Sequence, residues 1–332
     1  MGQSEHSHVV SRGYLRGFES ERGTVTVHDV VTGKTYETGA NEVGVRRNFY
    51  RRERPDGSNE FDVEESLAFV EDRGIPLLRA IGDLWPLCAD DKGAIATLLA
   101  LQHVRTPGWR DFIGELHVEA FASYRRERLD GLDGEQHEIT ERSIAAAETQ
   151  TATATHVLHR MLSQVYKAAS VMACMHWRIV DFAVPRLVTC DQPVVVWPIG
   201  LASSQPCRMP YNAGLLASLE IRFPLDPERA LLMAWLDLAD PIDPDRGLAR
   251  HARSLNAFTR AQADRHWIHH PQMAPRFASG PLLPISPELV TGYTQALAAT
   301  CVRRQQIAAI LDSHMGRTAD GTERVTVLEV AR

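Results

Sequence analysis

The chain has 332 residues, of which 44% are hydrophobic and 23% charged, and its formal net charge is −6. The composition is typical of a globular protein of one large or two ordinary domains, and it excludes disordered, fibrous and disulfide-stapled classes. The negative charge argues against binding nucleic acid through overall charge, because such binding relies on cationic side chains that displace counterions from phosphates.

The cysteines and the apolar segments bear on the cellular compartment. Five cysteines are scattered along the chain without a C-x-x-C pair, which favours reduced thiols over a disulfide framework or a zinc site. The sequence contains no visible secretory signal and no apolar run of membrane-spanning length. We therefore expect a soluble cytoplasmic protein that does not associate with membranes.

The first predicted elements are a β-hairpin and a helix. β-Branched residues around a Thr-Gly turn predict paired strands over residues 24–29 and 34–38. Asp62 is a plausible N-cap for a helix that runs towards Ile75, and Pro76 is expected to interrupt or end its first segment.

The remaining elements follow the order helices, strands, helices. Helices are predicted at about 90–105 and 139–175, the second as one helix or two joined by a slight break at its threonines. Mostly antiparallel strands follow from about 177 to 236, and helices return at about 248–265 and 287–311.

This order of elements favours an α+β fold over alternating β–α units. The chain has no internal repeat and no Gly/Ser linker. We expect a single globular domain over residues 1–332, with residues 283–332 as the candidate for a loosely attached C-terminal region.

Polar residues fall on the apolar faces of the two helices before residue 106. At about 100° per residue, Glu64 and Glu71 project into the apolar stripe of the first helix. In the second helix, Gln102 lies at the centre of the apolar face and Arg105 at its edge. Buried carboxylates are normally paired, hydrogen-bonded or coordinated to a metal. Two interpretations follow: a structural Glu–Arg brace that fixes the helix packing, or a cleft for acid–base chemistry or a divalent cation.

Asp191 lies where one predicted strand ends and the next begins. From this position it could project into a pocket on a rigid support, or it could cap backbone amides in a proline-containing turn. The neighbouring Cys190 is expected to be a buried, inert thiol, and the histidines at 266, 269 and 270 match no standard zinc spacing.

A basic segment over residues 46–54 interleaves five arginines with Phe49 and Tyr50. Such a pattern can grip a phosphate backbone and stack on bases, which makes this segment the one hint of a nucleic-acid partner. The alternative is a solvated basic loop whose two aromatic rings anchor it in the core. The candidate substrate-binding residues are Arg46, Arg47, Arg51 and Arg52.

Several fragments in a fixed order carry a family resemblance: His8-Val9-Val10, Gly13 to Phe18, Asn48-Phe49-Tyr50, Gln102 to Pro107, Thr189 to Pro193 and Phe223 to Pro227. Together they resemble the mainly bacterial family known as domain of unknown function 4238, over roughly residues 8–271. The chain departs from the family pattern at Ser11, where a proline is usual, and at Cys190 and Gln192, where S-D-N-P is favoured.

The resemblance implies no established activity, but it implies a shared set of polar positions. These positions are His8, Glu64, Glu71, Gln102, Arg105 and Asp191.

The first functional hypothesis is a metal-assisted hydrolase of nuclease or phosphodiesterase type, with the six polar residues converging in one catalytic pocket. Glu64, Glu71 and Asp191 would bind a divalent ion such as Mg²⁺ or Mn²⁺, His8 would act as ligand or general base, and Arg105 would stabilise charge on a phosphate. The alternative is a non-catalytic binding or regulatory protein in which the same residues form a buried structural cluster.

Overall fold

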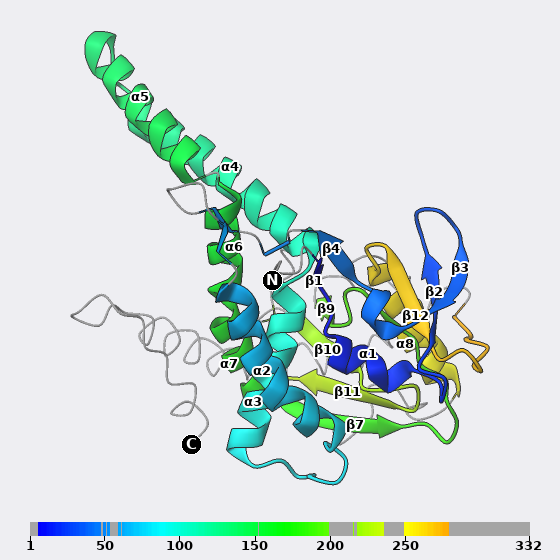
Figure 1. Cartoon of the computed structure of the whole chain (residues 1–332). Helices are drawn as coiled ribbons and strands as arrows, with labels where there is room; N and C mark the ends of the chain where they lie inside the picture. Colours follow the sequence, from blue (N-terminus) through cyan, green and yellow to red (C-terminus); the bar gives the residue numbers. More distant parts are fainter. Residues whose placement is uncertain are drawn as a thin grey trace.

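A computed structural model describes residues 6–47, 49–50, 52–53, 59–60, 62–151, 153–198, 215, 218–235 and 249–278. It confirms the α+β fold, with an N-terminal hairpin, a helical middle and antiparallel strands after residue 175 (Figure 1). The helix predicted over 287–311 and the C-terminal region 283–332 lie outside the described residues.

The helical middle of the chain runs from residue 62 to residue 174. It consists of α2 (Asp62–Arg79), α3 (Ala89–Val104), α4 (Pro107–Leu129), α5 (Gly134–Thr151), α6 (Ala154–Leu162) and α7 (Gln164–Cys174). Pro76 lies inside α2 and does not end it, because the helix continues to Arg79. The predicted break at the threonines is confirmed, with Thr153 capping α6, and a second break follows at Ser163.

Helices α4 and α5 form a long arm that projects from the rest of the molecule (Figure 1). The turn at the tip has Gly131 at φ 75° and Gly134 at φ 52°, backbone angles that glycine adopts without steric cost. Arg125 on α4 forms ion pairs with Glu141 at 2.9 Å and Glu148 at 2.7 Å on α5. These contacts hold the two helices of the arm together.

Two four-stranded antiparallel sheets contain most of the described strands. The first has the order β7-β11-β10-β9, with β7 at His176–Asp181, β9 at Val195–Pro198, β10 at Ser218–Pro224 and β11 at Arg229–Ala234. The second has the order β3-β2-β12-β8, with β2 at Val25–Asp29, β3 at Thr35–Thr38, β8 at Thr189–Cys190 and β12 at His266–His269. The predicted hairpin is therefore present as β2 and β3, and the predicted antiparallel strands after residue 177 include the β10–β11 pair.

Short elements complete the described chain. They are the strand pairs β1 (His6–His8) with β4 (Val45–Arg47) and β5 (Arg52–Glu53) with β6 (Asn59–Glu60), the helices α1 (Arg12–Leu15) and α8 (Ala249–Gln262), and 3₁₀ turns at Arg16–Phe18 and Ala40–Glu42.

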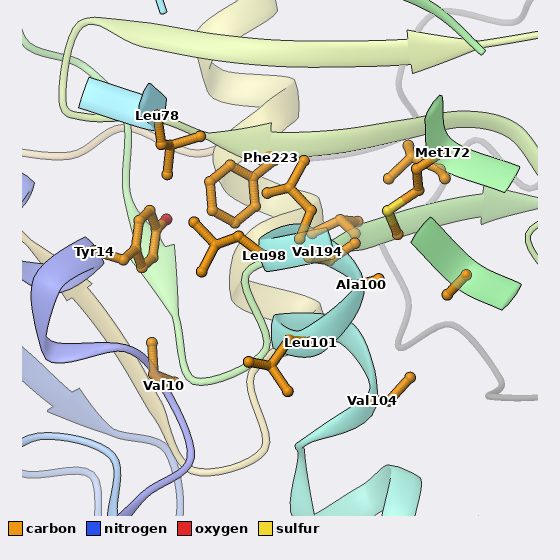
Figure 2. Packing of buried hydrophobic residues seen from close by; sticks show 14 of the residues in the cluster. Val10, Tyr14, Leu78, Leu98, Ala100, Leu101, Val104, Met172, Val194 and Phe223 are labelled. Carbon is orange, nitrogen blue, oxygen red and sulfur yellow. The ribbon is translucent and has the colours of Figure 1, made fainter. Parts of the chain in front are cut away.

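The main hydrophobic core lies between the helices α1, α2, α3 and α7 and the sheet that contains β10. Leu98 and Leu101 of α3, Met172 of α7 and Phe223 of β10 point into this space (Figure 2). Gly74 of α2 permits the close approach of α3, because a Cβ at this position would lie 2.8 Å from Leu98 Cβ. Close packing of this kind leaves no room for a larger side chain.

Tyr14 of α1 joins the two sheets. Its hydroxyl donates a hydrogen bond to the Pro224 carbonyl of β10 at 2.7 Å and lies 2.6 Å from the Thr189 hydroxyl of β8. Since the Tyr14 proton is used on the carbonyl, Thr189 must donate to the Tyr14 oxygen. One fully buried side chain thus ties the N-terminal helix to a strand from each sheet.

Two histidines on neighbouring strands β2 and β12 share a hydrogen bond. His269 Nδ1 donates to the His270 carbonyl at 2.8 Å, which leaves its Nε2 as an acceptor for His28 Nε2 at 3.1 Å. His28 Nδ1 in turn accepts from the Thr35 hydroxyl at 2.7 Å. Burial, and then the proximity of His269, lower the pKa of His28 to about 4.

The histidine pair predicts a loss of stability in mild acid. His28 stays neutral in the folded protein down to a pKa of about 4, whereas in the unfolded chain it binds a proton near 6.5. The free energy of unfolding should therefore fall as the pH drops from about 6.5 towards 4. Urea unfolding across this range should show a shallower pH dependence in His28→Gln than in wild type. His176→Gln, at an exposed position of β7, is the control, and an unchanged slope in His28→Gln contradicts the prediction.

None of the helices in the described part of the chain is long and apolar enough to cross a membrane.

Candidate functional site

Four of the predicted site residues, together with Ser11, approach one another where the N-terminal segment meets α2 and α3. His8 ends β1, and Ser11 caps the N-terminus of α1. Glu71 lies in the middle of α2, and Gln102 lies one turn before Arg105 at the end of α3. We call these five residues the polar cluster.

Glu71 is held from two sides. Its Oε1 accepts a hydrogen bond from Arg105 Nη1 at 2.5 Å, and its Oε2 accepts one from the Ser11 hydroxyl at 2.8 Å. The Glu71 side chain is 25% exposed, whereas that of Arg105 is 1% exposed. The ion pair therefore lies at the boundary of the interior, with its cation on the buried side.

Most of the hydrogen-bonding capacity of Arg105 and Gln102 is unused within the described part of the protein. Arg105 Nε and Nη2 and both polar atoms of the Gln102 amide are fully buried and have no hydrogen-bond partner among the described residues. Nε and Nη2 present parallel N–H bonds along one edge of the guanidinium, while Nη1, on the other side, binds Glu71. The free edge has the geometry that grips a carboxylate or a phosphate.

His8 adds a neutral imidazole to the cluster. Burial lowers its pKa below 6.5, the nearby Arg105 charge lowers it further, and the backbone of Val43 and the Glu71 carboxylate act in the opposite direction. His8 Nδ1 is buried without a hydrogen-bond partner among the residues that the structure describes. At neutral pH this ring is uncharged and can accept a proton.

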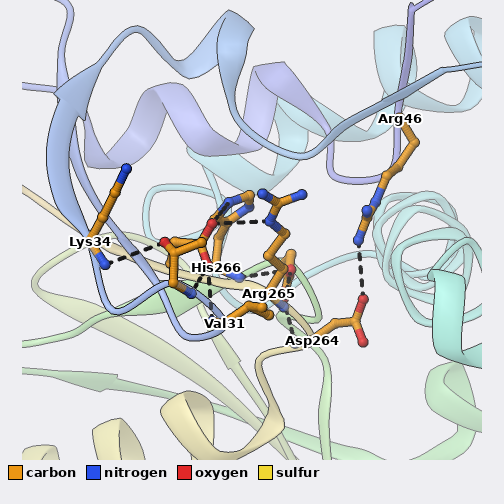
Figure 3. Close-up of polar contacts among 9 residues, drawn as sticks. Val31, Lys34, Arg46, Asp264, Arg265 and His266 are labelled. Carbon is orange, nitrogen blue, oxygen red and sulfur yellow. Dashed lines mark hydrogen bonds and ion pairs between the residues drawn. The ribbon is translucent and has the colours of Figure 1, made fainter.

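Asp191 belongs to a different group of hydrogen bonds. Its Oδ1 accepts from the backbone N–H of Asp264, and its Oδ2 accepts from those of Arg265 and His266, at 2.8 to 2.9 Å. This turn leads into β12, and Figure 3 shows Asp264, Arg265 and His266 side by side there. No hydrogen bond or ion pair within the described residues joins Asp191 to the polar cluster. Its position as a backbone cap thus matches one of the two arrangements expected from the sequence.

The Asp191 cap makes a prediction about stability. In Asp191→Asn, one carboxylate oxygen becomes an NH₂ group, which cannot accept the backbone N–H groups that face it. The loss of a buried hydrogen bond should lower the free energy of unfolding by about 1–3 kcal/mol. Urea unfolding measures this change, with Asp181→Asn on an exposed position of β7 as the control. Equal stability of the two variants would show that the turn does not depend on the carboxylate.

The carboxylates expected to bind a metal are already engaged with protein groups. Both oxygens of Glu71 and both oxygens of Asp191 accept hydrogen bonds, and the Glu64 side chain lies outside the described residues. Within the described ranges, no three His, Cys, Asp or Glu side chains are grouped so that they could hold a metal ion. The described donors therefore do not fit a Mg²⁺ or Mn²⁺ site.

The basic segment is only partly described. Arg46 pairs with Asp264 at 3.4 Å (Figure 3), whereas the side chains of Arg47, Arg51 and Arg52 lie outside the described residues. Phe49 and Tyr50 are 7% and 1% exposed, so protein atoms cover their rings. Arg110 lies over the Phe49 ring and donates to the Phe49 carbonyl. These two rings are therefore not available for stacking on nucleic-acid bases.

Sequence reasoning missed Ser11 as a site residue. Ser11 both donates to Glu71 and accepts from the backbone N–H of Tyr14, so it joins the helix cap to the cluster. A serine directly before a short helix is a typical N-cap signal, but the second hydrogen bond crosses 60 residues of sequence. Only the folded chain brings this pair together.

The chain belongs to a family of proteins of unknown function. The model of the family DUF4238 matches residues 6–273, which include the whole polar cluster, α8 and β12. No curated protein and no solved structure matches this chain. The family resemblance expected from the sequence is confirmed, and it leaves the activity to be inferred from the site.

Proposed function

We propose that the polar cluster binds the oxyanion of a phosphate ester. The observation that carries this proposal is the free edge of Arg105, a 1% exposed guanidinium whose Nε and Nη2 are buried and unpartnered within the described residues. A buried polar atom without a hydrogen bond costs about 1–3 kcal/mol. The adjacent Gln102 amide and His8 Nδ1 add to this cost. A purely structural brace gains nothing from such atoms, whereas a binding site uses them.

The electrostatics of the cluster support an anionic ligand. Glu71 neutralises one side of Arg105 and fixes its orientation, so the remaining edge is preorganised and not free to rotate. The Gln102 amide and the neutral His8 ring can add hydrogen bonds without adding charge. A planar guanidinium fork is suited to a phosphate or carboxylate oxygen pair.

We further propose that the ligand is a phosphodiester and that the chain hydrolyses it. His8 would take the proton of the attacking water as a new phosphorus–oxygen bond forms and the bond to the leaving oxygen breaks. The leaving oxygen would take its proton from solvent water, and the protonated His8 would then return its proton to solvent. Arg105 would stabilise the negative charge on the phosphoryl oxygens in the transition state. What supports this step is a lowered His8 pKa beside a guanidinium with an unused fork.

A non-catalytic binding protein is the second candidate. The double anchoring of Glu71 by Arg105 and Ser11 favours it, since this arrangement ties α1, α2 and α3 together whatever else the site does.

Binding and stability should respond in opposite directions to Gln102→Met. This change keeps the side-chain volume and removes two buried polar atoms, so the free energy of unfolding of the ligand-free protein should rise by about 1–3 kcal/mol. The affinity for a small phosphodiester such as bis(p-nitrophenyl) phosphate should fall, because the amide no longer contacts the oxyanion. Thermal unfolding and isothermal titration calorimetry measure the two effects. Gln136→Met, on the exposed surface of the arm, should change neither.

An increase in stability without a loss of affinity would contradict the binding proposal. It would leave the brace as the role of the cluster.

Hydrolysis is tested separately with bis(p-nitrophenyl) phosphate and with single-stranded DNA, with and without added Mg²⁺ or Mn²⁺. Removal of a general base should lower turnover by about a hundredfold or more, so we expect this loss in His8→Gln. Glu71→Gln should also lose activity, because Arg105 is no longer held by a charged partner. Equal activity in wild type and Glu71→Gln, or none in either, counts against catalysis while leaving the binding result intact.

A further inference from the structure

A second basic site lies beside α8, outside the polar cluster. A cavity of about 260 Å³ is lined there by three arginines from three separate segments. Arg186 comes from the loop between β7 and β8, Arg253 from α8, and Arg276 from the segment after β12. The small side chains of Ala252 and Ala274 also line the cavity.

Asn256, which is 1% exposed, holds the walls of this cavity in place. Its Nδ2 donates to the carbonyls of Arg186 at 2.8 Å and Arg276 at 3.0 Å, and its Oδ1 accepts from the Val188 N–H at 3.0 Å. In addition, the Arg253 carbonyl accepts from the N–H of Ala278 at 3.0 Å. The backbones that carry all three arginines are therefore fixed by hydrogen bonds, so the cavity is a built feature of the fold.

The three guanidiniums have no carboxylate partner in the part of the chain that the structure describes. Within the described residues, neither Arg186 nor Arg253 nor Arg276 forms an ion pair. By contrast, Arg222, Arg229 and Arg265 each pair with a carboxylate. Three cations that line one cavity repel one another, and an anion between them would convert this repulsion into attraction.

We propose that the cavity lined by Arg186, Arg253 and Arg276 binds a small oxyanion that carries at least two negative charges. The volume of about 260 Å³ lies slightly below the usual range of about 300–1,000 Å³ for sites of drug-sized ligands, which favours a compact anion. Guanidinium forks recognise phosphate and carboxylate oxygens alike, so a diphosphate and a small tricarboxylate share the chemistry that this site requires. The site is independent of the polar cluster and of any activity there.

Isothermal titration calorimetry of the full chain with inorganic pyrophosphate and with citrate tests the proposal and separates the two sources of the anion. Loss of one charge-assisted hydrogen bond should weaken binding about tenfold or more, so Arg253→Gln and Arg276→Gln should each raise the Kd by that factor. Binding should persist in Gln102→Met, which alters the polar cluster and leaves this cavity intact. It should also weaken as KCl is added, since the attraction is electrostatic.

Two matched variants distinguish a built site from general attraction to a basic surface. Arg250→Gln removes the same charge from an exposed position of α8 that does not line the cavity, and it should leave the Kd unchanged. Ala274→Leu keeps every charge and fills the cavity from an exposed position, so it should weaken binding without unfolding the protein.

Saturable binding of either anion that follows this pattern supports the proposal, and the preferred anion identifies the ligand class. Absence of saturable binding by both anions overturns the proposal. So does an equal loss in Arg250→Gln and Arg253→Gln, or full binding in Ala274→Leu.

Discussion

The arrangement of the N-terminal half depends on one buried cation, the Arg105 guanidinium at the end of α3. An uncompensated charge in the interior is costly, so the chain must bring a carboxylate to it. Glu71 supplies that carboxylate from α2, and Ser11 fixes the second oxygen from the start of α1. The start of α1, the middle of α2 and the end of α3 are thereby held in contact although they are distant in sequence. The same constraint fixes the orientation of the guanidinium, whose Nε and Nη2 are buried without a hydrogen-bond partner among the described residues.

The two proposed arginine sites would obtain their selectivity in different ways. Arg105 is desolvated and already paired, so a ligand there would be selected by hydrogen-bond geometry rather than by net charge. The cavity beside α8 gathers three partly solvated cations in a chain whose formal net charge is −6, so its field is local and opposite to that of the whole molecule. Such a site would attract anions strongly only at short range and low salt.

Local sequence patterns predicted the helices and strands more accurately than they predicted the contacts between those elements. The hairpin of β2 and β3, helix α3 and the β10–β11 pair follow from turn residues, caps and alternation. Helix α4 was not predicted, because Pro107 was interpreted as a residue that ends a helix. Proline is also common at the first position of a helix, and here Pro107 directly follows the Thr106 cap. Strand β12 was missed because its stability comes from β2 and β8, which lie far away in sequence. Pro76 was expected to interrupt or end its helix, but it lies inside α2, which continues to Arg79.

The candidate site shows the same division. The helix wheels found Glu71, Gln102 and Arg105, because inward polar positions repeat with the helical period. They could not place Asp191, whose three donors come from a turn 73 to 75 residues later in the chain.

The arm of α4 and α5 projects far from the rest of the molecule (Figure 1). Helix α4 has 23 residues and at 1.5 Å per residue is about 35 Å long. Apart from its base, the arm buries little apolar area, so its outer backbone amides should exchange their hydrogens through local opening. The amides of α3, which is buried, should exchange only when the whole protein unfolds.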